Sequence, residues 1–311
     1  MRVFITGASG WIGSAVVPEL LGAGHRVLGL ARSEASAAAL AEAGAEVRRG
    51  DLDDLDVLRS AAAESDGVIH LAFKHDLAFS GGFEAAVDAD RRAIDTFGEV
   101  LAGSDRPLLI ASGLLGLTSG RIATETDGTR SDPAESHGAG ALATRHANAH
   151  ATEALADRGV RSSVVRLPPT VHGDGDHGFL TSIVGIAREQ GVSGYIGDGA
   201  NRWPAVHRSD AARLFRLALE SAPAGSTLHA VADEGVPIRA VAEVIGRHLD
   251  LPQASVPADE AAGHFGWIAG YFGLDAPASA AYTRELLGWQ PTGPGLVDDL
   301  DKGHYFAGPH S

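Results

Sequence analysis

Val3-Phe4-Ile5-Thr6-Gly7-Ala8-Ser9-Gly10-Trp11-Ile12-Gly13 is an apolar run followed by three glycines at intervals of three residues. The apolar run predicts a buried strand, and the amphipathic segment over residues 11–23 predicts a helix directly after it. In that context Gly7 permits a tight turn, Gly10 lets a pyrophosphate approach the backbone, and Gly13 lets helix and strand pack closely. Because helix N-termini attract anions, we expect a phosphate-binding turn; the alternative is a glycine-rich turn without a ligand. The residues expected to hold the ligand are Gly7, Ser9, Gly10, Trp11, Ile12 and Gly13.

Outward from this stretch, short apolar runs alternate with alanine-rich helical segments. This alternation is typical of an α/β fold with a doubly wound parallel sheet. Strands are expected near residues 3–5, 26–30, 46–48, 68–72, 108–111, 163–166 and 227–231. Helices are expected near residues 11–23, 33–43, 54–63, 83–102, 140–157 and 209–220.

The regular alternation ends at Pro168-Pro169, and later segments are richer in glycine, proline and aromatic residues. We expect a nucleotide-binding domain over residues 1–168, to which residues 205–233 return. Residues 169–204 and 234–311 are expected to form a small, discontinuous substrate domain. The irregular stretch over residues 113–140 is long for a connection, which favours a functional role.

Composition excludes several classes of protein. The 311 residues contain 25 Lys plus Arg against 40 Asp plus Glu, and a net charge of −15 disfavours nucleic acid as a partner. With no cysteine there is no disulfide framework, thiolate nucleophile or Cys-ligated metal. No apolar run reaches the length of a membrane span, so we expect a soluble, cytoplasmic protein that binds a small-molecule substrate.

The GxxGxxG spacing resembles that of the extended short-chain dehydrogenases/reductases, which are epimerase/dehydratase-like, and the likeness covers nearly the whole chain. Later motifs carry it as well: Asp51-Leu52, His70-Leu71-Ala72, residues 166–173, residues 206–212 and residues 287–291. The resemblance implies a Rossmann sheet that binds a nicotinamide cofactor. It also implies cofactor contacts from Asp51, Leu52, Leu71, Ala72, Phe73, Pro168 and Val171.

The end of the second expected strand, Ala31-Arg32-Ser33, bears on the choice of cofactor. A site for NAD offers a carboxylate to the ribose here, whereas a site for NADP offers an arginine to the 2′-phosphate. No acid is present, and Arg32 with the Ser33 hydroxyl can bind a dianion. We therefore expect NADP; the alternative is that Arg32 is a solvated charge at the start of a helix.

The catalytic pattern of the family is incomplete in this chain. The family carries Tyr and, four residues later, Lys on the helix after the fifth strand, where this chain has Arg145 and Ala149. The family's Ser/Thr falls near Ser112-Gly113, where only Ser112 keeps a hydroxyl; an offset of one residue would place glycine there instead. The sequence therefore resembles an atypical subgroup that keeps the nucleotide fold and lacks the usual acid.

Histidines are the candidates to replace that acid. His75, with Asp76 beside it, follows the fourth strand and is the first choice as acid/base; Lys74 is a lesser candidate. His146 lies one residue from the missing Tyr and is a further candidate. His146 and His150 also have the spacing of a zinc pair, but no third ligand is evident, so we expect no metal and favour surface or dimer-interface histidines.

Two further regions have open interpretations. His172, Asp174, Asp176 and His177 form a polar cluster expected at the floor of the substrate pocket. Trp203 and Trp267 are interpreted either as pocket lining or as core. The helices over residues 83–102 and 140–157 correspond to those that pair across a two-fold axis in similar proteins, so we expect a homodimer.

The functional expectation is NADP-dependent hydride transfer to or from a small carbonyl, imine or enone. The alternatives are a non-catalytic NADP-binding regulator and a sugar-nucleotide epimerase or dehydratase.

Overall fold

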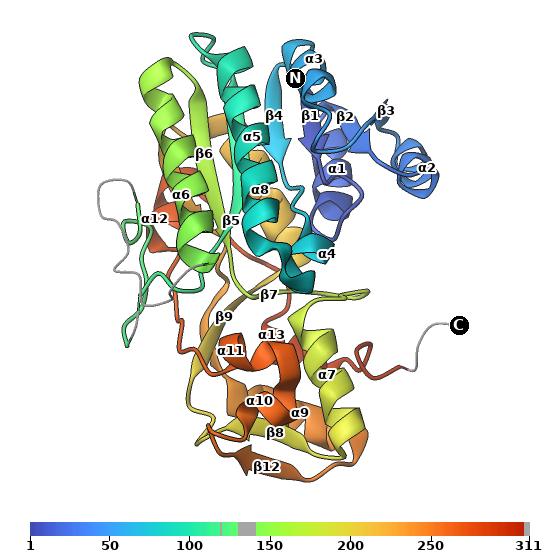
Figure 1. Ribbon diagram of the computed structural model, residues 1–311, viewed down its shortest axis with the longest axis vertical. Coiled ribbons are helices and arrows are strands. Elements are labelled where there is room, and N and C mark those ends of the chain that lie inside the picture. Colours follow the sequence, from blue (N-terminus) through green and yellow to red (C-terminus); the bar gives the residue numbers. More distant parts are fainter. Residues whose placement is uncertain (119, 130–140, 308–311) are drawn as a thin grey trace.

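The computed structural model describes residues 1–118, 120–129 and 141–307, so part of the expected loop over residues 113–140 lies outside the described residues. Its centre is a seven-stranded parallel sheet in the order β10-β6-β5-β4-β1-β2-β3 (Figure 1). The strands are β1 (Arg2–Thr6), β2 (Arg26–Ala31), β3 (Glu46–Arg49), β4 (Gly67–His70), β5 (Pro107–Gly113), β6 (Arg161–Leu167) and β10 (Ser226–His229). The doubly wound α/β prediction is confirmed. The strand order reverses between β1 and β4, the place where such sheets bind ligands.

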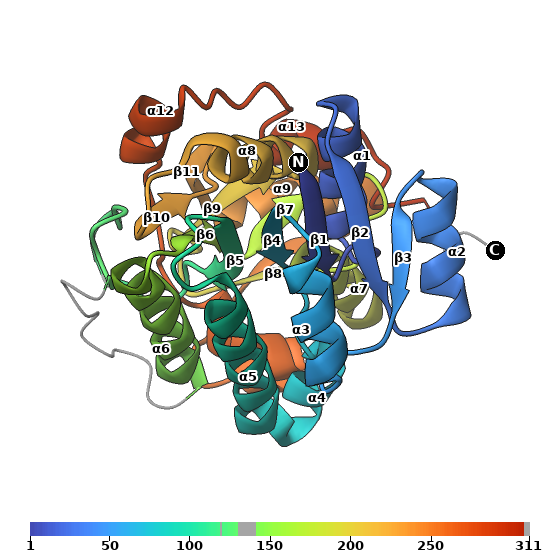
Figure 2. The same ribbon diagram turned by 90° about the horizontal axis from the view of Figure 1, so that it is seen from above.

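Helices cover both faces of this sheet, as Figure 2 shows from above. The helices α1 (Gly13–Gly22) and α8 (Arg208–Ser221) pack together on one face. The other face carries α3 (Leu55–Ala63), α5 (Phe83–Leu101) and α6 (Ala141–Ala154), while α2 (Glu34–Glu42) lies beside β3. Assembly as a homodimer through α5 and α6 stays a prediction.

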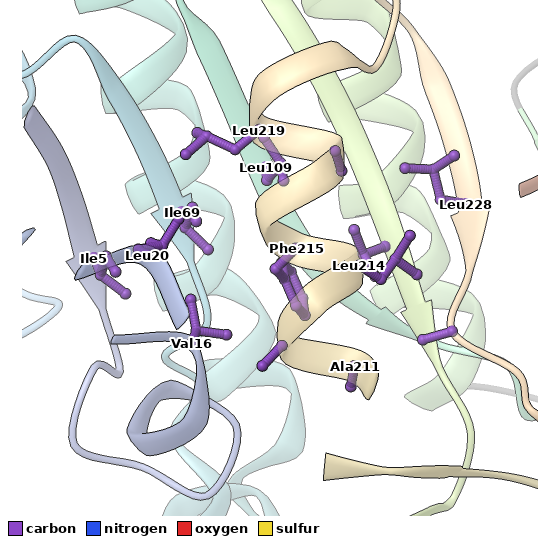
Figure 3. Packing of buried hydrophobic residues seen from close by; sticks show 14 of the residues in the cluster. Ile5, Val16, Leu20, Ile69, Leu109, Ala211, Leu214, Phe215, Leu219 and Leu228 are labelled. Carbon is purple, nitrogen blue, oxygen red and sulfur yellow. The ribbon is translucent and has the colours of Figure 1, made fainter. Parts of the chain in front are cut away.

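Alternating side chains explain why the sheet can be buried on both faces. In β1, Ile5 joins the core beneath α1 and α8, whereas its neighbour Phe4 belongs to the opposite core. Figure 3 shows Ile5 and Ile69 facing Val16 of α1, with Phe215 of α8 in the same layer. Burial of these apolar side chains stabilises the sheet and so holds in place the carboxyl ends of its strands, where the candidate site lies.

The rest of the chain forms two small sheets and a third core below the large sheet in Figure 1. One sheet contains β7 (Thr170–His172), β9 (Arg202–His207) and β11 (Asp233–Pro237); the other contains β8 (Ser193–Ile196) and β12 (Gln253–Val256). The helices here are α7 (Phe179–Gln190), α9 (Ile238–Leu249), α10 (Ala261–Phe265), α11 (Ala269–Phe272) and α13 (Leu296–Asp301). The helix α12 (Ala281–Leu287) instead packs on β10 and α8 of the large sheet. The proposed domain limits stay a prediction.

The two tryptophans with open interpretations differ. Trp203 is buried in the third core, so for this residue the core interpretation holds. Trp267 is 54% exposed and stacks on Phe179 with ring centroids 5.6 Å apart.

Candidate functional site

The glycine turn after β1 is packed too tightly to admit side chains. Gly7 has φ +69°, and its carbonyl accepts a hydrogen bond of 3.0 Å from Gly10 N. A Cβ on Gly7 would lie 2.7 Å from Ala72 N, and one on Gly13 would lie 2.2 Å from Gly7 O. The turn therefore lies directly against the segment after β4, which brings the predicted residues Gly7, Gly10, Gly13 and Ala72 together.

Trp11 joins this turn to the second part of the chain. Its indole N–H donates to the carbonyl of Val171 at 2.8 Å, and the guanidinium of Arg208 lies 4.2 Å from its ring centroid. The ring of His177 contacts Trp11 edge-on at 5.7 Å. Trp11 and Val171, predicted independently as cofactor contacts, are thus neighbours.

Two arginines flank Ser33 at the adjoining ends of β2 and β3. Ser33 caps α2, its hydroxyl accepting from Ser36 N at 3.1 Å. The side chain of Arg32 is 75% exposed and lies 3.5 Å from the even more exposed Asp76, so this solvated contact leaves the guanidinium available to a ligand. Arg49 donates to the Ser33 carbonyl at 2.5 Å and pairs with Glu34. Sequence reasoning missed Arg49, although parallel pairing places it in register with Ala31.

The predicted adenine contacts lie at the start of α3, beyond β3. Leu52 is buried, and the carboxylate of Asp51 accepts from Asp53 N at 2.7 Å. The Nζ of Lys74 lies 2.5 Å from Asp53 Oδ2, so the ammonium group of this lesser catalytic candidate is engaged in an ion pair.

A buried chain of hydrogen bonds starts at Thr6, beside the glycine turn. The Thr6 hydroxyl and His70 Nδ1 are 2.6 Å apart, and His70 Nε2 lies 3.1 Å from Asp90 Oδ1. The other oxygen of Asp90 accepts from Asn148 at 2.7 Å. Although burial opposes it, the hydrogen bond from His70 lowers the pKa of Asp90, so this carboxylate is ionised. The chain connects β1, β4, α5 and α6.

Sequence reasoning missed Asp90 and Asn148, but a pattern for Asp90 was available. On α5 the buried residues Ala86, Asp90, Ala93 and Phe97 follow helical spacing, so a carboxylate interrupts the apolar face. An acid in that position indicates an interior partner. Asn148 sits in a run of small and polar residues and offers no comparable pattern.

The three catalytic candidates lie at neighbouring strand ends and on α6. Ser112 is the second-last residue of β5, is buried, and has no hydrogen-bond partner for its hydroxyl within the described part of the chain. His75 follows β4 in the short helix α4 (His75–Leu77), where its ring contacts Phe73 edge-on at 5.1 Å. His146 lies on α6 and is 9% exposed.

His146 is buried, so the surface interpretation is wrong for this residue, while the dimer-interface interpretation stays a prediction. Burial, with the charge of Arg166 second, lowers the pKa of His146 to about 4, while a hydrogen bond to the Leu115 backbone opposes the shift. His150 Nε2 bonds the carbonyl of Gly128 at 3.1 Å. Among the described residues no group of three or more His, Asp or Glu side chains could hold a metal ion.

Arg145 lies near both histidine candidates; its correspondence to the family's tyrosine stays a prediction. Its guanidinium lies over the Phe73 ring, 4.2 Å from the centroid. Desolvation and then the charge of Arg145 lower the pKa of His75, although the residue as a whole is exposed. The same charge contributes to the lowered pKa of His146. Both imidazoles are therefore neutral near pH 7.

Side chains of the C-terminal segment form hydrogen bonds with the expected polar cluster after β6. His172 is fully buried, with Nδ1 2.9 Å from Asp299 Oδ2. Asp176 accepts hydrogen bonds from the Tyr305 hydroxyl at 3.0 Å and from Gly178 N at 2.7 Å. Asp299 and Tyr305 were not found from the sequence because they lie more than a hundred residues from their partners.

Comparison with known proteins identifies the family. Residues 3–231 match the NAD dependent epimerase/dehydratase family. The chain belongs to this family. The resemblance to extended short-chain dehydrogenases/reductases is thereby confirmed.

Curated relatives span most of the chain. An uncharacterized protein of Schizosaccharomyces pombe is 47% identical over 98% of this chain and all of its own length. An uncharacterized protein of Saccharomyces cerevisiae is 44% identical over 96% of this chain and 98% of its own. A sterol-4-alpha-carboxylate 3-dehydrogenase, decarboxylating, of Dictyostelium discoideum is 28% identical over 76% of this chain and 73% of its own.

Solved structures share the fold. The dTDP-glucose 4,6-dehydratase DesIV of Streptomyces venezuelae, with NAD and TYD bound, superposes with a TM-score of 0.76 at 20% identity, covering 98% of this chain and 96% of that one. A UDP-glucose 4-epimerase of Thermotoga maritima gives 0.74 at 17% identity, covering 98% of both chains. Among the described residues of this chain, no helix has the length and apolarity of a membrane span.

Proposed function

We propose that this protein is an NADP-dependent oxidoreductase that transfers a hydride to or from a small carbonyl, imine or enone. The observation that carries the proposal is the pair Arg32 and Arg49 beside Ser33, at the adjoining ends of β2 and β3, together with the absence of an acid on β2. Two guanidinium groups at that edge suit a 2′-phosphate, whereas a ribose hydroxyl would need a carboxylate. The N–H groups at the start of α1 would hold the pyrophosphate.

The residues after β4 and β5 suit the proton and the substrate oxygen. Bound nicotinamide supplies or accepts the hydride. His75, neutral at pH 7, can accept a proton from an alcohol during oxidation and return it during reduction. The hydroxyl of Ser112, which has no hydrogen-bond partner among the described residues, can donate to the substrate oxygen. His146 is held by the Leu115 backbone, which suits a positioning role.

The first prediction concerns cofactor choice. Arg32→Ala should weaken NADPH binding roughly tenfold to a hundredfold, because a charge-assisted phosphate contact is lost, and should leave NADH binding unchanged. Calorimetric titration of both cofactors measures this. Arg26→Ala is the matched control, since Arg26 begins the same strand and pairs with Glu46 at the opposite edge of the sheet. Tighter binding of NADH than of NADPH by the unaltered protein would contradict NADP as the cofactor.

The second prediction concerns His75. His75→Ala should lower kcat about a hundredfold and leave NADPH affinity intact, because only proton transfer is lost. Since the pKa of His75 is lowered from 6.5, kcat for alcohol oxidation should fall with decreasing pH at an inflection below 6.5. The variant should lack that inflection. His248→Ala serves as the control, because His248 of α9 pairs with Asp301 of α13 at the surface. An unaltered kcat in His75→Ala removes this residue from the mechanism.

A non-catalytic NADP-binding regulator is the second candidate. It is favoured by Arg145 and Ala149 in place of the family's tyrosine and lysine. A panel of ketones, aldehydes, imines and enones separates the two candidates. Tight NADPH binding without hydride transfer to any of them favours the regulator. Turnover of nucleotide sugars instead favours an epimerase or dehydratase.

A further inference from the structure

Arg145 is a desolvated cation that forms no ion pair with any of the described residues. Desolvation lowers its pKa, and the residue is partly buried on α6. Within residues 1–118, 120–129 and 141–307, its contact is the Phe73 ring at 4.2 Å, and no carboxylate forms an ion pair with it. A cation stacked on an aromatic ring keeps some stabilisation, but its N–H donors still need acceptors. Such a group is costly unless something pairs with it.

The nearest acid does not supply that pairing. Asp90 raises the pKa of Arg145 by its charge, yet its Oδ1 bonds His70 at 3.1 Å and its Oδ2 accepts from Asn148 at 2.7 Å. The other titratable neighbours, His75 and His146, have lowered pKa values and are neutral. Within the described part of the chain, the N–H donors of Arg145 therefore have no carboxylate acceptor.

The position of this charge is set by the cofactor turn. Phe73 directly follows Ala72, whose backbone lies against Gly7, so Arg145 stands at the carboxyl edge of the sheet beside the expected cofactor. The Phe73 ring lies against the guanidinium carbon, and among the described residues no carboxylate pairs with its N–H groups, so a ligand can accept from them. A planar carboxylate matches a guanidinium with two parallel hydrogen bonds.

We propose that Arg145 binds a carboxylate of the substrate, and that the substrates are small oxo acids and their hydroxy acids. The assignment of oxo acids as substrates of reduction rests on the proposed function. The binding of a carboxylate by Arg145 does not depend on it. In reduction the ketone carbon gains a hydride from NADPH and its oxygen gains a proton, giving a hydroxy acid and NADP⁺. The carboxylate is unchanged and serves to orient the ketone.

The test compares acids with neutral analogues of the same shape. Pyruvate, acetoacetate, levulinate and phenylpyruvate, each with its methyl ester, are titrated calorimetrically into the protein saturated with NADP⁺. We expect at least one acid to bind roughly tenfold to a hundredfold more tightly than its ester, as a charge-assisted contact provides. Arg145→Met should abolish that preference and Arg145→Lys should retain part of it. Arg91 of α5 forms a solvent-exposed ion pair with Asp95, so Arg91→Met should keep the preference for the acid in full.

Two further measurements keep the outcomes distinct. Thermal unfolding and NADPH affinity should be alike in Arg145→Met and the unaltered protein, which shows that the variant folds. If no acid outcompetes its ester, or if Arg145→Met keeps the preference, the carboxylate site is overturned even when ketones are reduced. If acids bind in an Arg145-dependent way without oxidation of NADPH, the carboxylate site stands and the proposed hydride transfer fails.

Discussion

Replacing Gly13 with alanine is expected to abolish measurable NADP(H) binding. The added Cβ would lie 2.2 Å from Gly7 O and 2.7 Å from two backbone atoms of Ala8, distances at which atoms cannot coexist. Helix α1 would have to move away from the turn, and its N-terminal N–H groups would leave the expected pyrophosphate position. Fluorescence titration with NADPH measures the loss, which should exceed a hundredfold.

The matched control lies in the same helix. Gly22→Ala, at the last turn of α1, has no atom within 4 Å of the new Cβ. Because alanine is the better helix former, this variant should bind NADPH normally and be stabilised by up to about 1 kcal/mol. Thermal unfolding of both variants separates loss of the turn from loss of the fold. Normal NADPH affinity in a folded Gly13→Ala protein would contradict the assignment of this turn.

The cofactor turn was predictable because everything it requires is local in sequence. Strand β1, the glycines and α1 occupy one continuous segment, so periodicity and spacing suffice. The contact from Ala72 was predicted from the family resemblance. The structure shows that Ala72 lies directly against the turn, because a Cβ on Gly7 would be only 2.7 Å from Ala72 N. The parallel sheet followed from the alternation of strands and helices.

The rest of the candidate site depends on packing between distant segments. Asn148 meets Asp90 across 58 residues, and Asp299 meets His172 across 127, distances over which a single sequence carries no pairing information. Arg145 could be placed at the tyrosine position by counting. Its contact with the Phe73 ring, and the absence of a carboxylate partner among the described residues, became visible only when α6 and the segment after β4 were packed together.

Two buried histidines make the fold sensitive to acid. His229 ends β10, where its Nδ1 bonds the Ser279 carbonyl at 2.8 Å and its Nε2 lies 3.4 Å from a nitrogen of Arg166. One ring nitrogen therefore donates to a carbonyl while the other accepts from a cation, which requires the neutral ring. Burial, followed by the charge of Arg166, lowers the pKa of His229 to about 3. His146, with a pKa lowered to about 4, behaves likewise.

We expect the free energy of unfolding to fall steeply as the pH drops below 6.5. Above the unfolded-state pKa of 6.5 neither state binds these protons and the full stability is present. Below pH 6.5 both histidines are protonated in the unfolded chain. In the folded chain they stay neutral until the pH reaches about 4 for His146 and about 3 for His229. Each difference corresponds to a loss on the order of 3 to 5 kcal/mol, comparable with much of a domain's net stability.

The measurement is urea unfolding at a series of pH values between neutrality and about pH 4. His229→Gln cannot take up the proton in either state, so its stability should depend less steeply on pH than that of the unaltered protein. Leu228→Ala is the matched control on the same strand, because it removes a fully buried apolar side chain without altering any titration. It should lower stability by about 2 to 5 kcal/mol at every pH and keep the original slope. Since His229 is held neutral by Arg166, equal slopes in His229→Gln and the unaltered protein would mean that the buried ring is protonated beside that arginine.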